Sequence, residues 1–351
     1  MNNLHAKLIA SAAATLIAVP AFAAEVSRGN EGSGETPRAA PGGRTISDRG
    51  VPLTPKLEEG GLETRGLQLD PAAAERSYGT ISRNSKGEVK NTPPSEELKR
   101  ALFGDQKTEN ENAEPMPQGN EGTRQVFGAD DRVQITKTDA YPFRTIGLLQ
   151  GQTADGNLGN CSATLIGPRT VLTAAHCLYS HDGGGWLDNF VFAPGLVDMQ
   201  NAPFGVWEYE EAYIFEGFVS NYQGFYGSVV PWDIGVIILK DPIGDQLGWI
   251  PYGYDMSMGS FYANIVGYPG DKPAGTMWRA NCDVPKEAMA DYWFQYQCDT
   301  YPGSSGSSVY IYNPKDKSRI VYGINVAESP DANTAVRINP VYFDWLEQLW
   351  K

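Results

Sequence analysis

The chain has 351 residues and a formal net charge of −14 at pH 7. This acidity argues against a nucleic-acid partner, because such a partner requires a basic face that replaces the counterions of its phosphates. All eight tryptophans and all four cysteines lie after Asn160. A core is therefore expected in the C-terminal part, whose roughly 220 residues are enough for one sizeable folded unit.

The chain begins with the features of a secretory signal peptide. A short polar start that contains Lys7 is followed by an apolar stretch from Leu8 to Val19 and by Ala21-Phe22-Ala23, a small-x-small cleavage signal. A membrane anchor is the alternative, but about a dozen apolar residues are too few to cross a bilayer core of about 30 Å. We therefore expect residues 1–23 to be removed, no membrane span, and secretion to the periplasm or the medium.

Residues 24–126 are expected to form a propeptide or tail that is mostly disordered. The segment is rich in Gly, Pro, Glu, Arg and Asn and has few aromatic residues, so it can bury little apolar surface. A permanently attached disordered linker is the alternative. A short helix is predicted from Ser95 to Phe103, where it could dock on the folded domain.

Residues 127–351 are predicted to form an all-β domain. Short runs with the composition of strands are separated by Gly, Pro and Asp, which fits a barrel better than alternating helices and strands. Asn339-Pro340 predicts the start of a C-terminal helix, and the apolar residues that follow it are expected to pack on the β domain. The predicted strands are 163–166, 171–174, 234–239, 264–267, 307–312 and 320–326.

Three segments could carry chemistry. Apart from one near the N-terminus, the histidines are His176, in Thr-Ala-Ala-His-Cys, and His181, which we interpret as a solvated loop residue. His176 is a candidate general base, Ser305 in a Gly-rich turn is a candidate nucleophile, and Asp233 begins a β-branched run. Taken singly, Ser305 and Asp233 could be turn residues. Together, in the order His, Asp, Ser, they favour a catalytic triad.

At these motifs the chain resembles the secreted chymotrypsin-fold (trypsin-like) serine endopeptidases, and within them the bacterial glutamyl-endopeptidase, or V8-like, branch. The resemblance runs from about Ala129 to the C-terminus, and processing is expected between Glu121 and Gly128. The segment Gly303 to Val309 fits the serine motif of the branch except for Ser308, where the branch has proline. The resemblance implies two six-stranded antiparallel β-barrels and a short C-terminal helix.

The resemblance also implies roles for individual residues. The backbone N–H groups of Gly303 and Ser305 would form the oxyanion hole. Thr300 matches a pocket threonine that helps bind a substrate glutamate, but Asn325 stands where the branch has a histidine. Asp299 occupies the position that gives trypsin-like enzymes their basic preference. Acidic, basic and other specificities therefore stay open.

The cysteines are expected to form disulfides, because an exported protein folds in an oxidising compartment. Four cysteines allow three pairings, and the resemblance implies Cys161–Cys177, beside the catalytic histidine, with Cys282–Cys298 as the second bridge. A metal site is the alternative, but neither Cys-x-x-Cys nor His-Glu-x-x-His is present, so no metal or cofactor is expected.

The sequence thus predicts a monomeric serine endopeptidase that acts on proteins or peptides and is made as a zymogen with its own propeptide as partner. Ser304 stands where pancreatic zymogens have the aspartate that pairs with the new N-terminus, so that ion pair is unavailable here. Two alternatives remain: a catalytically silent protease fold used for binding or adhesion, and an esterase with the same triad.

Overall fold

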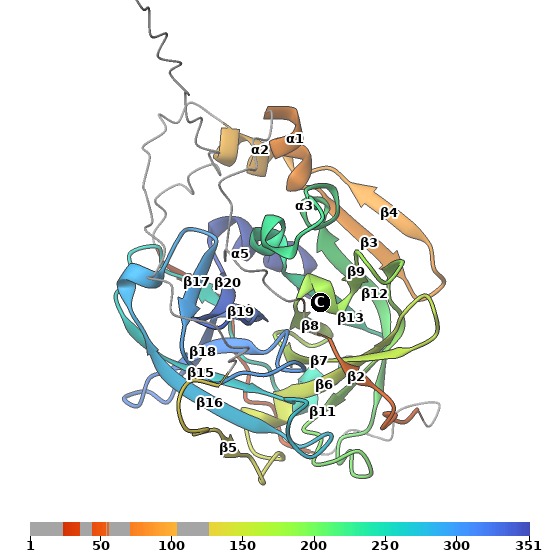
Figure 1. Ribbon diagram of the computed structural model, residues 1–351, viewed down its shortest axis with the longest axis vertical. Helices are drawn as coiled ribbons and strands as arrows, with labels where there is room; N and C mark the ends of the chain where they lie inside the picture. The colour runs from red at the N-terminus through yellow and green to blue at the C-terminus, as the bar shows by residue number, and fades with distance from the viewer. Residues whose placement is uncertain (1–23, 36–43, 54, 56–70, 104–125) are drawn as a thin grey trace, which may run out of the picture.

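The computed structural model describes residues 24–35, 44–53, 55, 71–103 and 126–351. The predicted signal peptide and most of the expected processing region lie outside these residues. Two large β-sheets lie side by side, with few helices at their margins (Figure 1). None of the helices in the described part of the chain is long and apolar enough to cross a membrane.

The first sheet contains a closed six-stranded barrel. Its strands follow one another in the order β11-β6-β7-β8-β13-β12, and β12 pairs back with β11. Every residue of β13 is buried, as its run of apolar and β-branched residues predicts. The strands are β6 (Ile146–Gln152), β7 (Leu158–Leu165), β8 (Thr170–Thr173), β11 (Asp188–Pro194), β12 (Trp207–Phe215) and β13 (Gly235–Leu239).

The second sheet is open. Its order is β17-β20-β19-β18-β15-β16-β5, and no ladder joins β17 to β16 among the described residues. Where two closed barrels are expected, the structure has one barrel and one half-barrel. The Cys282–Cys298 disulfide links β16 to the residue two positions after β17, so a covalent bond spans the open side. The strands are β5 (Val133–Gln134), β15 (Phe261–Gly267), β16 (Trp278–Val284), β17 (Trp293–Tyr296), β18 (Ser308–Tyr312), β19 (Arg319–Ala327) and β20 (Asn333–Arg337).

The described parts of the N-terminal segment are folded against the domain, so the expectation of a mostly disordered tail is wrong for them. A hairpin of β3 (Thr80–Asn84) and β4 (Val89–Thr92) extends the first sheet along β12. Tyr78 and Ile81 are buried, and the Tyr78 hydroxyl lies 2.7 Å from that of Tyr292. A segment with few apolar residues can be ordered this way, because it docks on a core that the domain supplies.

Two short helices flank this hairpin. α1 (Pro71–Ser77) precedes it, and α2 (Glu96–Phe103) follows it. α2 is the predicted docking helix, and the Ser95 hydroxyl caps it by accepting a hydrogen bond from Leu98 N at 3.1 Å. Leu98 and Leu102 are buried in the same core cluster as the barrel.

Two further N-terminal strands touch the domain. β1 (Glu25–Val26) pairs with β14 (Gly253–Tyr254), and β2 (Val51–Pro52) pairs in parallel with β7. β2 lies beside β7 and so belongs to the first sheet (Figure 1). We call residues 44–53, which contain β2, the strap.

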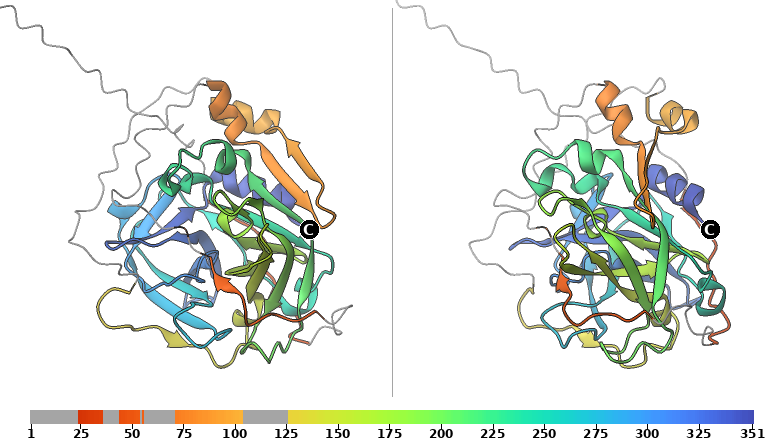
Figure 2. Two further views of the ribbon diagram at one scale, coloured as in Figure 1. Left: turned by 45° about the vertical axis from the view of Figure 1, so that its right-hand side comes forward. Right: turned by 90° about the vertical axis from the view of Figure 1, so that its right-hand side faces the viewer.

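The C-terminal helix α5 (Pro340–Leu349) begins at the predicted cap, where Asn339 Oδ1 accepts a hydrogen bond from Tyr342 N at 3.0 Å. It packs on more than the second sheet. The Trp345 ring lies 4.5 Å from that of Phe215 in β12, and its Nε1 donates to Thr80 Oγ1 at 2.9 Å. The hairpin and α5 therefore lie side by side (Figure 2).

The remaining elements are short. They are the α-helices α3 (Glu216–Ser220) and α4 (Gly244–Leu247), the strands β9 (Tyr179–Ser180) and β10 (Gly185–Trp186), and the 3₁₀ helices η2 (Phe143–Thr145), η3 (Ala175–Cys177), η4 (Tyr226–Ser228), η5 (Val230–Trp232) and η6 (Lys286–Ala288).

Candidate active site

The barrel brings His176 and Asp233 to the same end of two paired strands. His176 lies in η3, just after β8, and Asp233 lies just before β13. β8 and β13 are antiparallel, and Thr173 lies opposite Gly235. The turn after β8, which carries His176, therefore lies beside the turn before β13, which carries Asp233. A β-carbon at position 235 would lie 3.1 Å from the carbonyl oxygen of Ala174, and glycine permits this approach.

Asp233 holds both the backbone and the ring of His176. Asp233 Oδ1 accepts a hydrogen bond from His176 N at 2.8 Å, and Oδ2 lies 2.7 Å from Nδ1. The Asp233 side chain is fully buried and that of His176 is 7% exposed. This double contact fixes the imidazole orientation and leaves Nε2 as the ring nitrogen available for chemistry.

Ser305 lies in the loop between β17 and β18, which is bound to the first barrel through its backbone. Ser162 N donates to the Ser305 carbonyl at 2.8 Å, and Ser162 Oγ donates to the Gly303 carbonyl at 2.8 Å. A β-carbon at position 306 would collide with Ser162 O and lie 3.2 Å from Ala174 N, two residues before His176. The loop therefore brings Ser305 to the His176 side of the barrel.

The atom of His176 that could take a proton from Ser305 is Nε2. It is buried and has no hydrogen-bond partner among the described residues. Gly303 has a φ of +100° and Gly306 of +83°, values that favour glycine on both sides of Ser305. The Gly-rich turn predicted around Ser305, the candidate nucleophile, therefore has the backbone conformation that its glycines permit.

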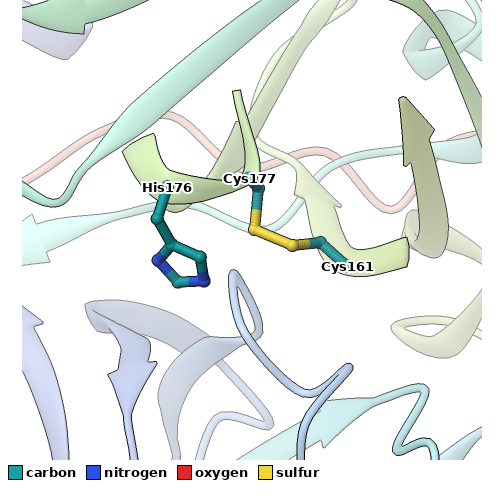
Figure 3. Close-up of side chains that lie close together, drawn as sticks. All are labelled: Cys161, His176 and Cys177. Carbon is teal, nitrogen blue, oxygen red and sulfur yellow. A yellow bond between two sulfur atoms is a disulfide. The ribbon is translucent and has the colours of Figure 1, made fainter. Parts of the chain in front are cut away.

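A disulfide lies beside the histidine. Cys161 and Cys177 are joined, with a Cα–Cα distance of 6.1 Å, as are Cys282 and Cys298, so the structure contains both expected pairs. Figure 3 shows the first disulfide next to the His176 imidazole. Cys161, His176 and Cys177 have the spacing of a metal cluster, but the two sulfurs are bonded to each other and offer no thiolates.

The three candidate pocket residues differ in their hydrogen-bond partners. Asn325 is buried, its Oδ1 accepts a hydrogen bond from the Tyr296 hydroxyl at 2.5 Å, and its Nδ2 has no partner among the described residues. Thr300 Oγ1 lies 3.4 Å from Glu328 Oε1. Asp299 accepts from Phe127 N at 2.7 Å and from Asp131 N at 3.2 Å, so its carboxylate holds the start of the domain.

His181 differs from its expected place in a solvated loop. Its ring stacks on that of Tyr222 at 3.9 Å, and its Nε2 lies 2.8 Å from the Phe218 carbonyl. Burial lowers the pKa of His181. The residue is half-buried in an aromatic cluster at the edge of the barrel, because α3 packs over the loop that carries it.

One protein-family model matches most of the folded domain. The model of the trypsin family, described as "Trypsin", matches residues 133–346. The chain belongs to the trypsin family.

Individual relatives of the chain are also named as proteases. The glutamyl endopeptidase of Bacillus licheniformis is 35% identical over 188 residues, which are 53% of this chain and 55% of that protein. A Bacillus subtilis protein named extracellular metalloprotease is 30% identical over 64% of this chain and 69% of its own length. The chain thus spans about half to two thirds of the length of these relatives.

A solved structure shares the fold. The structure of a Glu endopeptidase in complex with MPD superposes with a TM-score of 0.55 at 22% sequence identity, covering 64% of this chain and 98% of the other. At this identity the likeness concerns the fold alone. It supports the all-β chymotrypsin-like architecture described above.

Sequence reasoning missed Tyr226 in this trypsin-family site. Its hydroxyl donates to Asp233 Oδ2, the oxygen that also contacts His176, and its ring lies edge-on to the imidazole at 6.0 Å. Burial, followed by the charge of Asp233, raises the pKa of Tyr226 well above its usual range, so the hydroxyl stays protonated at working pH. No motif marks this residue, because its role depends on the fold of the loop before Asp233.

Replacement of Tyr226 by phenylalanine should lower kcat about tenfold, because Asp233 loses one hydrogen bond. The hydrogen bond from Tyr226 no longer offsets the charge of Asp233 beside the imidazole, so the acid limb of kcat/KM should move to higher pH. The pH profile of purified protein measures this shift. A uniform loss of rate with an unmoved acid limb would contradict the positioning role.

Proposed function

We propose that this protein is a secreted serine endopeptidase with His176, Asp233 and Ser305 as its triad. The observation that carries the proposal is the double contact of Asp233 with the backbone and ring of His176, at the end of the barrel that also binds the Ser305 loop. Membership of the trypsin family and the names of the glutamyl-endopeptidase relatives support peptide-bond hydrolysis.

In this mechanism the Ser305 Oγ proton passes to His176 Nε2 while Oγ bonds to the carbonyl carbon of the substrate. Asp233 keeps the proton-bearing Nδ1 of His176 turned toward itself and stabilises the imidazolium. The backbone N–H groups of Gly303 and Ser305 stabilise the oxyanion. His176 then protonates the leaving amine, and water hydrolyses the Ser305 acyl-enzyme by the same steps.

The name of the Bacillus subtilis relative suggests a metal-dependent alternative. In the described part of the chain, the cluster with metal-ligand spacing is the one that contains the Cys161–Cys177 disulfide. Only the histidine of that cluster offers a ligand atom, so these residues do not fit a metal centre. The serine mechanism is therefore preferred.

The test uses protein whose N-terminal segment has been cleaved after folding. We would incubate it with a diverse peptide library, read the cleavage sites by mass spectrometry, and run Ser305→Ala in parallel. A fluorophosphonate should lose fluoride and label Ser305. Ester hydrolysis without peptide cleavage would identify an esterase, and an unlabelled Ser305 with no turnover would identify a binding module.

The strap suggests how the enzyme is kept inactive before processing. Leu53 N donates to the Asn160 carbonyl at 2.8 Å, next to Cys161, and Asn160 Nδ2 donates to the Gly50 carbonyl at 3.1 Å. Pro52 contacts Gly270, and its Cβ would lie 3.5 Å from a β-carbon at Gly303. The strap thus packs beside the proposed oxyanion-hole glycine, and we infer that it obstructs the approach of a substrate carbonyl.

The hairpin serves a different purpose in this proposal. Tyr78 and Ile81 complete the core of the domain, and Trp345 of α5 bonds to Thr80. The hairpin therefore supports folding, whereas the strap blocks the cleft. A single N-terminal segment would act both as a folding aid and as an inhibitor.

Loosening the strap should activate the uncleaved chain. Leu53→Asp places a charge against Gly159, whose position the Leu53 side chain covers, and should raise kcat/KM for a short peptide at least about tenfold over the uncleaved wild type. Mass spectrometry must show the chain intact during the assay. Val89→Asp, in the exposed hairpin strand, is the matched control and should change nothing. Equal activity of intact and cleaved wild type would refute the inhibitory role.

A further inference from the structure

Beside the proposed pocket lies a buried carboxylate that the resemblance did not assign. Glu328 directly follows β19 and is 4% exposed. Thr300 Oγ1 donates to Glu328 Oε1 at 3.4 Å, and Asn325 lies three residues before Glu328 in the same strand end. The residues expected to recognise a substrate side chain therefore include an acidic neighbour.

The charge of Glu328 reaches both the triad and the pocket wall. It contributes, after burial and Asp233, to the raised pKa of Tyr226, and after burial to the raised pKa of Tyr296. Tyr226 bonds to Asp233, and Tyr296 bonds to Asn325. The Tyr226 hydroxyl also lies 3.3 Å from the carbonyl oxygen of Val326, two residues before Glu328, so the strand end that carries Glu328 contacts the side chain that bonds to Asp233.

The Asp299 carboxylate is bound to the backbone at the start of the domain. Both of its carboxylate oxygens accept backbone N–H groups, from Phe127 and Asp131, and the side chain is 3% exposed. Its role here is to anchor the start of the domain. The carboxylate that bonds to a predicted pocket side chain is that of Glu328.

We propose that Glu328 selects substrates with lysine or arginine on the acyl side of the scissile bond, an inference that rests on the proposed function of the same site. A buried carboxylate attracts an ammonium or guanidinium group and repels a glutamate side chain. The Nδ2 donor of Asn325 would favour a carboxylate by only about tenfold, as one neutral hydrogen bond, whereas a desolvated charge pair is worth on the order of 100-fold to 1000-fold. The charge therefore decides the preference.

The experiment uses protein whose N-terminal segment has been cleaved after folding, and it measures kcat/KM for peptides that differ only in the residue before the cleaved bond: lysine, glutamate or alanine. Wild type should prefer lysine to glutamate by on the order of 100-fold. Glu328→Gln keeps the shape of the side chain and should lose most of this preference while it retains alanine cleavage. Asp299→Asn is the matched control, a second buried acid next to Thr300, and should keep the lysine preference.

A binding measurement tests the pocket without relying on turnover. Benzamidine, a small planar cation, should bind Ser305→Ala protein whose N-terminal segment has been cleaved after folding, and benzoate should not. Calorimetry should show benzamidine binding weakened at least about tenfold when Glu328→Gln is added. This measurement remains informative if the Glu328→Gln enzyme is too unstable to assay, because binding to the parent chain is itself the result.

The outcomes separate this inference from the proposed function. Ser305-dependent cleavage after glutamate, or a lysine preference that Glu328→Gln leaves intact, would overturn the role of Glu328 and leave the endopeptidase standing. Absence of all Ser305-dependent cleavage would overturn the endopeptidase. In that case failure of benzamidine to bind would overturn the cation pocket as well, and Glu328-dependent binding would keep it.

Discussion

Ser305→Ala should lower kcat for peptide hydrolysis by on the order of 10⁵-fold to 10⁶-fold, because it removes the only atom that can form the acyl-enzyme. A residual rate above that in water is expected, since the oxyanion donors of Gly303 and residue 305 remain in the backbone. Binding of a substrate peptide should be little changed. Single-turnover kinetics with a chromogenic peptide, compared with equilibrium binding, would separate the two effects.

Ser304→Ala is the matched control for this variant. Ser304 is adjacent, is also buried, and has its N–H bonded to the Tyr301 carbonyl at 2.8 Å, a bond that alanine retains. Its kcat should remain within about tenfold of wild type, and both variants should unfold at similar temperatures. Activity of Ser305→Ala near the wild-type level would remove Ser305 from the mechanism.

Asp233→Asn should lower kcat by about 10⁴-fold. Asp233 contacts His176 with two oxygens, one at the backbone N–H and one at Nδ1. Asparagine has one oxygen, which can accept from only one of these groups, and its NH₂ group, which can only donate, faces the other. If it accepts from the backbone N–H, the NH₂ group faces Nδ1 and favours the tautomer that carries the proton on Nε2. That tautomer cannot take a proton from Ser305, so the base is lost although the shape of the site is kept.

The pH dependence of kcat for Asp233→Asn, measured beside that of exposed Asp283→Asn, would test this explanation. The control removes one negative charge from β16 at a distance from the site and should leave kcat within about twofold of wild type. More than a tenth of the wild-type kcat in Asp233→Asn would exclude Asp233 as the residue that sets the tautomer.

Much of the site was predictable because each of its parts is local in sequence. Thr-Ala-Ala-His-Cys supplies a histidine among small residues, Asp233 precedes a buried β-branched run, and glycines flank Ser305. Each motif allows the backbone conformation of its own short segment to be predicted. Their order along the chain then suggests that they meet, as the backbone contacts of Ser162 and Asp233 now show for the segments that carry them.

The contacts that could not be predicted join residues far apart in sequence. Asp299 bonds to Phe127, 172 residues away, and Trp345 bonds to Thr80, 265 residues away. The N-terminal segment reads as disordered from composition alone, because composition counts the apolar surface that a segment carries and not the surface that another part of the chain offers to it.

The sequence by itself determined the family resemblance, the all-β class, the cysteine pairs implied by that resemblance, and the three candidate catalytic residues, since each depends on short-range patterns. Only the tertiary structure decided that the second sheet stays open beside its disulfide, that the strap lies against Gly303, that Asp299 bonds to the start of the domain, that Tyr226 contacts Asp233, and that Thr300 contacts Glu328. The physical reason is that burial and charge partners are properties of a place in space, which several distant segments build together.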